Sequence, residues 1–330
     1  MQTSKLKTLF ILKYLEQFSD EEHPLTTTQL IQMLEKDGIT CERKSIYADV
    51  KALNEIGCNI VSVKSPKKGF FMASRTFEIP EVRLLIDAVT FAGFITPNKT
   101  KALVNKLESL VSFYQAKELT SQVYRESENK CDNEEIYYII DNLDEAISIN
   151  KKVKFTYKRR NIDKENKKSY TTKTFIVSPY SLIWKEDHYY LVCNNEKYDN
   201  LMNLRLDRMR KIEILDETAR PVEEVSEYED GVFDSADYAA KMFNMFSGKT
   251  ENVKIICHLD LREEMMDRFG SKIPFTAIDN DHFSTTVKAA VSDGLVSWVM
   301  QYGNKIKVTE PESLVEKIKE KATSIISVYQ

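Results

Sequence analysis

The chain has 330 residues, of which 42% are hydrophobic and 30% are charged. This length predicts two or three domains, and the composition is too apolar for a disordered protein. The net charge of −4 excludes a uniformly basic coat for nucleic acid. Any DNA-binding surface must therefore be a local patch.

The cysteines and the N-terminus indicate the compartment. Five cysteines are scattered along the chain, and no two of them form a C-x-x-C pair. An odd, dispersed set argues against both a disulfide framework and a zinc site. The first residues lack the apolar core of a signal peptide, and no segment approaches the length needed to span a bilayer. We expect a cytoplasmic protein that binds no metal and contacts no membrane.

Residues 1–75 begin with the pattern of two helices. A stripe of leucines predicts a helix over residues 5–17: Leu6, Leu9, Leu12 and Leu15. A second helix follows, with Thr26 or Thr27 as its N-cap and Gly38 as its stop.

A third helix and a hairpin complete this first unit. The helix is expected to start after Thr40 as N-cap and to end at Gly57. Two short strands, residues 59–63 and 70–72, flank a turn at residues 65–69. Three helices followed by a hairpin predict a winged helix-turn-helix DNA-binding domain.

The third helix has two different faces. Its apolar residues are expected to pack on the first two helices: Ile46, Val50 and Leu53 against Leu9, Leu12, Leu30 and Leu34. In a helix-turn-helix this helix lies in the major groove, and its first turns face the bases. Arginine can bind guanine through two hydrogen bonds, and lysines in a wing suit phosphate contacts. The residues expected to contact DNA are Arg43, Lys44, Ser45, Tyr47 and Lys51 in the helix and Lys64, Lys67 and Lys68 in the wing.

Local charge supports this interpretation. Six basic and two acidic residues lie between Arg43 and Met72, a local charge of +4 within an acidic chain. The alternative is that these are ordinary solvated surface charges, or that the helix-turn-helix serves protein contacts. The basic turn directly after the third helix favours DNA binding over both.

Residues 76–150 are predicted to be a helical connector. Helices are expected to restart near Pro80 and Pro97, and a third long helix to cover residues 133–149. Two apolar stripes suggest a dimerisation surface, although a local three-helix core could also use them: Leu84, Leu85 and Val89, and Leu103, Leu107 and Leu110.

From residue 151 the hydrophobic period changes to two. Consecutive short strands over residues 151–233 predict a small antiparallel barrel or sandwich. Residues 234–330 begin with a helix and then alternate strands, around Val253, Thr285 and Ile306, with helices. An α+β multidomain protein follows from these patterns.

Three stretches resemble the WYL-domain transcriptional regulators. The third helix, RKSIYADVKALNEIG, is similar to the family's recognition helix, except that Ala48 replaces an arginine of its pattern. Tyr189-Tyr190-Leu191 stands in place of the family's Trp-Tyr-Leu, after a Ser178-Pro179-Tyr180 segment that also fits. Leu204-Arg205-Leu206-Asp207-Arg208-Met209 resembles its Phe-Arg-Leu-Asp-Arg-Ile.

The resemblance implies a winged helix, an Sm-like or SH3-like β-barrel for the WYL domain, and a ferredoxin-like C-terminal extension domain. It also implies a homodimer. In this family the WYL domain is regarded as an effector-binding module, with nucleic-acid or nucleotide ligands for some members.

The residues of the WYL segment suit an anionic effector. Arg205 and Arg208 would point to opposite sides of a straight strand, so they converge only if the chain turns near Asp207. Paired guanidinium groups beside aromatic rings suit a phosphate or a stacked base. The expected effector-binding residues are Ser178, Tyr180, Tyr190, Arg205 and Arg208. The alternative is a surface pair of Arg205 with Asp207, with Arg208 in solvent.

These patterns predict a ligand-responsive transcriptional regulator that binds a double-stranded operator as a homodimer and senses a nucleotide or single-stranded nucleic acid. The alternative is a sensor that binds nucleic acid without sequence preference, or a protein-interaction adaptor. An enzyme is not expected, because the sequence contains neither a dinucleotide nor a P-loop glycine motif and its four histidines are isolated. No cofactor is predicted.

Overall fold

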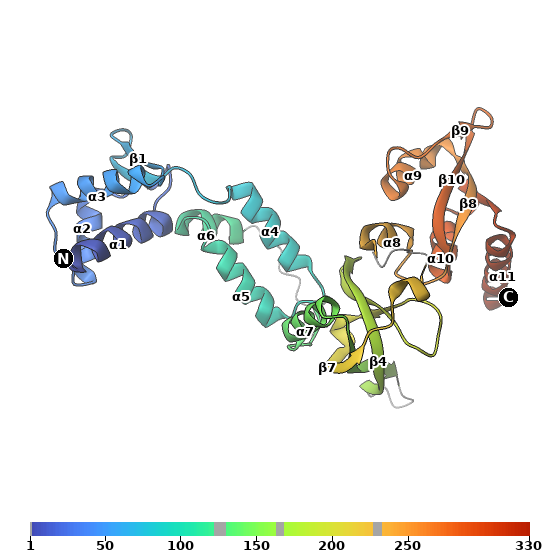
Figure 1. The fold of residues 1–330 in the computed structure, drawn as a ribbon. Helices are drawn as coiled ribbons and strands as arrows, with labels where there is room; N and C mark the ends of the chain where they lie inside the picture. The colour runs from blue at the N-terminus through green and yellow to red at the C-terminus, as the bar shows by residue number, and fades with distance from the viewer. Residues whose placement is uncertain (1, 122–129, 163–167, 227–232) are drawn as a thin grey trace. The chain divides into compact units, whose positions relative to one another are not determined.

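The computed structural model describes residues 2–121, 130–162, 168–226 and 233–330 (Figure 1). The chain divides into two compact units, Met1–Asp132 and Asn133–Gln330. Both contain helices and antiparallel sheet, so the expected α+β multidomain architecture is confirmed. In these residues no helix is long and apolar enough to cross a membrane.

The first unit opens with the expected three helices and hairpin. They are α1 (Gln2–Phe18), α2 (Thr27–Lys36), α3 (Arg43–Glu55), β1 (Ile60–Val63) and β2 (Gly69–Met72). The two strands pair antiparallel, with Ile60 opposite Met72. Ile46, Val50 and Leu53 of α3 are buried in one core with residues of α1, α2 and the hairpin.

The ends of α2 follow from local chemistry, whereas the start of α3 was predicted wrongly. Thr26 caps α2 by accepting a hydrogen bond from the Gln29 amide at 3.2 Å, and the Gln29 side chain accepts one from the Thr26 amide at 2.8 Å. This reciprocal pair is a capping box. Gly38 follows the helix with φ +76°, a conformation that glycine adopts without steric cost. The N-cap of α3 is Glu42 rather than Thr40.

The leucine stripe of α1 is only partly buried. Leu6 and Leu9 are 49% and 61% exposed, whereas Ile11, Tyr14 and Leu15 are buried. Residues three apart turn by about 300° around a helix, so such a stripe drifts by about 60° at each step. Over three steps it crosses half the helix circumference. Leu9 therefore does not anchor α3, contrary to expectation.

Removing the Thr26 cap should lower the local stability of α2. Thr26→Ala should destabilise α2 by about 1 kcal/mol, because it leaves an amide of the first turn without its acceptor. We expect about fivefold faster amide exchange in peptides covering α2, by hydrogen-exchange mass spectrometry of the full chain. Thr28→Ala is the matched control, since Thr28 is exposed within the same helix. Equal exchange in both variants would contradict the role of the cap.

Three further helices complete the first unit: α4 (Ile79–Phe91), α5 (Pro97–Glu108) and α6 (Phe113–Ser121). They share a small core that contains Val82, Ile86 and Val111, with Leu107 and Leu110 packed against it. One of the two predicted apolar stripes thus serves this local core. Leu84 on α4, by contrast, is 70% exposed.

The second unit begins with α7 (Ile136–Ser148) on a five-stranded sheet. The strands are β3 (Lys151–Ile162), β4 (Lys168–Lys185), β5 (His188–Asn194), β6 (Met202–Arg205) and β7 (Met209–Thr218). The helix packs against β3, β4 and β7 and buries its apolar face, which includes Ile139 and Leu143. It therefore lies with this sheet, although its sequence was grouped with the helical connector.

The sheet is open. Its strand order is β6-β5-β4-β3-β7, all antiparallel, and among the described residues β6 and β7 do not pair with each other. The expected closed barrel is therefore not found. The 18-residue β4 pairs with β3 along its first part and with β5 along its second, and its register shifts between Pro179 and Ser181.

The C-terminal part has a second sheet. After α8 (Ser235–Lys241) come β8 (Lys249–His258), α9 (Arg262–Phe269), β9 (Thr276–Ala277), β10 (His282–Val291), α10 (Asp293–Met300), β11 (Ile306–Glu310) and α11 (Glu312–Tyr329). The strand order is β11-β8-β10-β9, all antiparallel. From β8 to β11 the elements run in the β-α-β-β-α-β order of the expected ferredoxin-like unit. The sequence did not predict the two-residue β9.

Candidate nucleic-acid and effector sites

The outer face of α3 is basic and exposed. Arg43, Lys44, Tyr47 and Lys51 are all exposed on this helix. The Tyr47 ring lies edge-on to Phe70 of β2, with 5.3 Å between ring centroids. This contact joins the outer face of the helix to the hairpin, so both present their polar residues from one rigid core.

A polar network fixes the rotation of α3 against α1. Lys7 donates a hydrogen bond to the Ser45 hydroxyl at 2.6 Å, and its ammonium lies 2.8 Å from the Asp49 carboxylate. Thr8 donates to the other Asp49 oxygen at 2.7 Å. Ser45 is thus held on the α1 side, whereas the other predicted DNA contacts of α3 point outward. This role of Asp49 was not predicted, although its four-residue spacing from Ser45 places both residues on one helix face.

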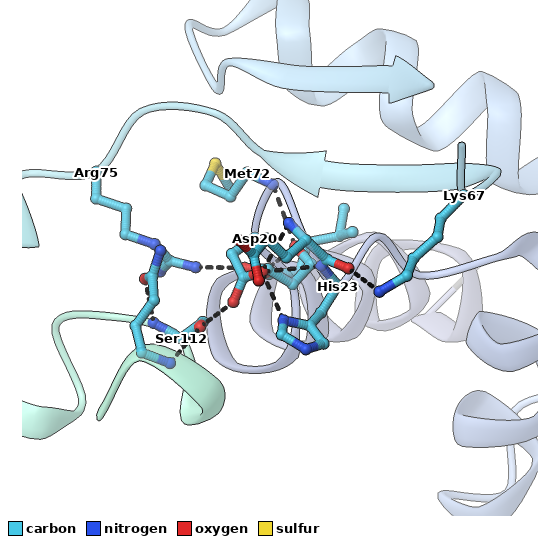
Figure 2. A network of polar contacts seen from close by, with 10 residues as sticks. Asp20, His23, Lys67, Met72, Arg75 and Ser112 are labelled. Carbon is cyan, nitrogen blue, oxygen red and sulfur yellow. Dashed lines mark hydrogen bonds and ion pairs between the residues drawn. The ribbon is translucent and has the colours of Figure 1, made fainter. Parts of the chain in front are cut away.

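The basic turn of the hairpin is exposed at all three predicted lysines, Lys64, Lys67 and Lys68. Lys67 donates a hydrogen bond to the Glu22 carbonyl oxygen at 2.7 Å (Figure 2). This bond ties the turn to the segment between α1 and α2. Contacts of these eight residues with DNA stay a prediction.

The chain does turn at Asp207, within the segment of residues 204–209. A 3-10 turn, Leu206–Arg208, separates β6 from β7. The Arg205 guanidinium binds Asp207 through two hydrogen bonds, of 3.0 and 2.7 Å, one to each carboxylate oxygen. This is the pairing that the alternative interpretation expected, and Arg208 is exposed. The Arg205 guanidinium is therefore oriented by Asp207, whereas Arg208 is exposed and its side chain forms a hydrogen bond with Tyr157.

The groups around this turn are coupled electrostatically. Burial by itself would raise the pKa of Asp207, but hydrogen bonds from Arg205 and nearby positive charges lower it instead. Burial raises the pKa of Tyr157 and of Tyr190, against the opposing influence of Arg205 and Arg208. The Tyr157 hydroxyl accepts a hydrogen bond from the Arg205 amide at 3.2 Å. The turn thus combines one exposed cation, an internal ion pair and two neutral phenols.

His188 joins this cluster and was missed by the sequence analysis. Its ring lies edge-on to Tyr190, with 6.2 Å between centroids. Burial, followed by the charge of Arg205, lowers its pKa, so the imidazole is neutral at neutral pH. The signal was available, because residues two apart in a strand share one face of the sheet.

Ser178 and Tyr180 have other partners. The buried Ser178 hydroxyl accepts a hydrogen bond from the Arg220 amide at 2.8 Å. The Tyr180 hydroxyl donates to the Arg220 carbonyl oxygen at 2.9 Å. Both side chains therefore hold the segment that follows β7. The structure brings together Tyr190, Arg205 and Arg208 of the five predicted residues, and their binding of an effector stays a prediction.

The second unit carries two domains of known families. The model of the WYL domain matches residues 138–214, which cover most of α7, the strands β3 to β6, the turn at Asp207 and the first part of β7. The model of the WCX domain matches residues 249–326, which hold the ferredoxin-like elements. The chain therefore contains a WYL domain followed by a WCX domain.

Among solved structures the chain is similar to the proteasome accessory factor B/C (PafBC) of Arthrobacter aurescens. The two are 12% identical with a TM-score of 0.26, and the match covers 95% of this chain and 47% of that one. The chain thus spans about half the length of that structure. No curated protein matches.

Proposed function

We propose that the protein is a ligand-responsive DNA-binding transcriptional regulator of the cytoplasm. Residues 1–75 act as a winged helix that binds an operator. Residues 76–150 connect it, through α7, to residues 151–233, whose sheet α7 packs against and which sense an effector. Residues 234–330 form a linker helix and the C-terminal extension domain. The WYL and WCX matches support a regulatory role. The resemblance of α3 to the recognition helix of WYL-domain transcriptional regulators supports DNA binding.

The observation that best supports DNA binding is the exposed basic face of α3 beside a basic hairpin turn. In a chain with a net charge of −4, this local concentration of positive charge attracts phosphates. The inner face of α3 is fixed by Ile46, Val50 and the Lys7–Asp49 ion pair, so the outer face is held rigidly. A rigid helix positions its donors for base edges without a cost for ordering the backbone, so only the side chains lose freedom on binding.

The proposed effector is an anion with an aromatic or phosphate-bearing part, such as a nucleotide or a short single strand. The exposed Arg208 can bind a phosphate through its planar fork. Arg205 is already aligned by Asp207, and aromatic rings next to cations favour stacked bases. Bound effector would alter operator affinity through its different affinities for two conformations.

We further propose a homodimer. Paired half-sites raise the affinity of modules that each contact few base pairs. Leu84, Leu85 and Phe91 give α4 an exposed apolar surface, which suits an interface between two copies.

The test is selection from a randomised duplex library, followed by footprinting of the selected sequences. We expect two related half-sites whose centres lie about 10–10.5 base pairs apart, or a multiple of this spacing. Uniform protection of any duplex would instead support a sensor that binds nucleic acid without sequence preference. No retained DNA at all would favour the protein-interaction adaptor.

A further inference from the structure

Residues 19–23, in the segment between α1 and α2, contact the hairpin and the residue Arg75 just after it at three points. The Ser19 hydroxyl accepts a hydrogen bond from the Met72 amide at 3.1 Å, and the Ser19 carbonyl accepts one from Arg75 at 2.8 Å. Lys67 binds the Glu22 carbonyl oxygen. The segment is therefore attached to the hairpin turn at Lys67, to the last residue of β2 at Met72, and to the chain after β2 at Arg75 (Figure 2).

The same segment reaches α6 through the Asp20 carboxylate, which is only 5% exposed. Its Oδ1 atom accepts hydrogen bonds from the segment itself: the Glu22 amide, the His23 amide and His23 Nδ1, at 3.1, 2.9 and 2.8 Å. Its Oδ2 atom accepts one from Ser112 at 2.5 Å. One oxygen thus shapes the segment, and the other connects it to a residue 92 positions away.

Ser112 is the cap of α6. Its hydroxyl accepts from the Gln115 amide at 3.1 Å, and the Gln115 side chain accepts from the Ser112 amide at 3.1 Å. A carboxylate at a helix N-terminus is favourable because the helix dipole is positive there. Burial alone would raise the pKa of Asp20, but the hydrogen bonds from Ser112 and His23 lower it. The buried carboxylate is therefore charged, which favours its place beside the first turn of α6.

A ring contact reinforces the connection. The His23 ring stacks on Tyr114 of α6, with 3.8 Å between centroids and 9° between planes. Phe18 at the end of α1 packs near Phe113, with 6.4 Å between centroids. By contrast, the covalent link between hairpin and α4, residues 73–78, contains neither helix nor strand. The side-chain contacts, rather than this link, can fix the orientation of the helix-and-hairpin module on α6.

We propose that Asp20 is a positioning residue whose contacts with Ser112 and His23 latch the module of residues 1–72 onto α6. This inference rests on the proposed function and extends it: the latch sets the separation of DNA half-sites that a dimer accepts. A loosened latch leaves the DNA-contacting face of α3 intact. It removes the preference for one half-site spacing.

The experiment compares the parent with Asp20→Asn and Tyr114→Ala on a series of duplexes. The duplexes carry the selected half-sites with the spacing changed by one to three base pairs, and one duplex carries a single half-site. Asparagine keeps the size of Asp20 but cannot accept all the hydrogen bonds that a carboxylate accepts. We expect the parent to prefer one spacing at least tenfold and the variants to prefer it less than threefold, with single-half-site affinity unchanged within twofold. Tyr114→Phe, which retains the stacked ring, should restore the preference of the parent.

Three results are distinguishable. Variants that keep the spacing preference of the parent would overturn the latch alone. Variants whose affinity for a single half-site falls as much as their affinity for the preferred spacing would show that Asp20 only supports folding of the module. That result also overturns the latch. A parent that shows no preference for any selected half-site would overturn the proposed function, and with it the latch.

Discussion

Replacing Arg43 and Lys44 together by alanine should weaken binding to a selected operator by at least about 30-fold. Each side chain that binds a base edge contributes about 1–3 kcal/mol of discrimination, so removing both costs about 2–6 kcal/mol. Both side chains are exposed in the first turn of α3, so their removal leaves the core untouched. The measurement is a gel-shift titration at fixed salt.

The control for this variant is a pair of lysines on another helix. Lys101→Ala with Lys106→Ala removes the same charge from exposed positions of α5 and should leave affinity nearly unchanged. Equal affinity of the Arg43/Lys44 variant and the α5 control would contradict DNA recognition by α3.

The lysines of the hairpin turn should behave differently. Lys64→Ala with Lys68→Ala should weaken binding to all sequences alike and reduce the slope of log affinity against log salt concentration by about 0.9 for each phosphate that is no longer neutralised.

Arg208→Ala should weaken binding of an anionic effector by about 10- to 150-fold. A hydrogen bond to a charged group contributes about 1.5–3 kcal/mol, and Arg208 is exposed at the turn after β6. The fold should survive, because the Arg205–Asp207 pair remains. Arg205→Ala is a less clean test, since it leaves the Asp207 carboxylate, 14% exposed, without its partner.

Calorimetry with nucleotides and short single-stranded oligonucleotides measures this effect. Arg205→Lys keeps the charge but loses the planar fork, so it should weaken binding to a smaller degree. Lys197→Ala, in the exposed loop after β5, is the control for net charge. The response of operator binding to the best ligand should disappear in Arg208→Ala, while operator binding without ligand stays the same. Unchanged ligand affinity would show that Arg208 is an ordinary surface residue that does not bind the effector.

Local signals predicted most elements of the fold. Thr26 and Gly38 bounded α2, because caps depend on neighbouring residues. The predicted burial of Leu6 and Leu9 was wrong, because residues spaced by three do not stay on one face of the helix. Closure of the WYL sheet could not be predicted, since it depends on whether two strands that are not neighbours in the sheet meet.

The candidate sites show the same division. A turn near Asp207 was the condition for Arg205 and Arg208 to converge, and the structure contains such a turn. The partners of Ser178 and Tyr180 lie 42 and 40 residues away in sequence, and no periodicity predicts such pairings. The Asp20–Ser112 hydrogen bond spans 92 residues, which makes it a property of the tertiary structure alone.

Competition binding tests the central claim, sequence-specific recognition of DNA, most directly. Labelled operator from the selection is bound by the full chain and displaced with unlabelled operator or with a duplex of the same composition in scrambled order. At one fixed, near-physiological salt concentration, the scrambled duplex should compete at least about 1,000-fold more weakly, as expected for specific binding. Equal competition by the two duplexes would contradict the claim.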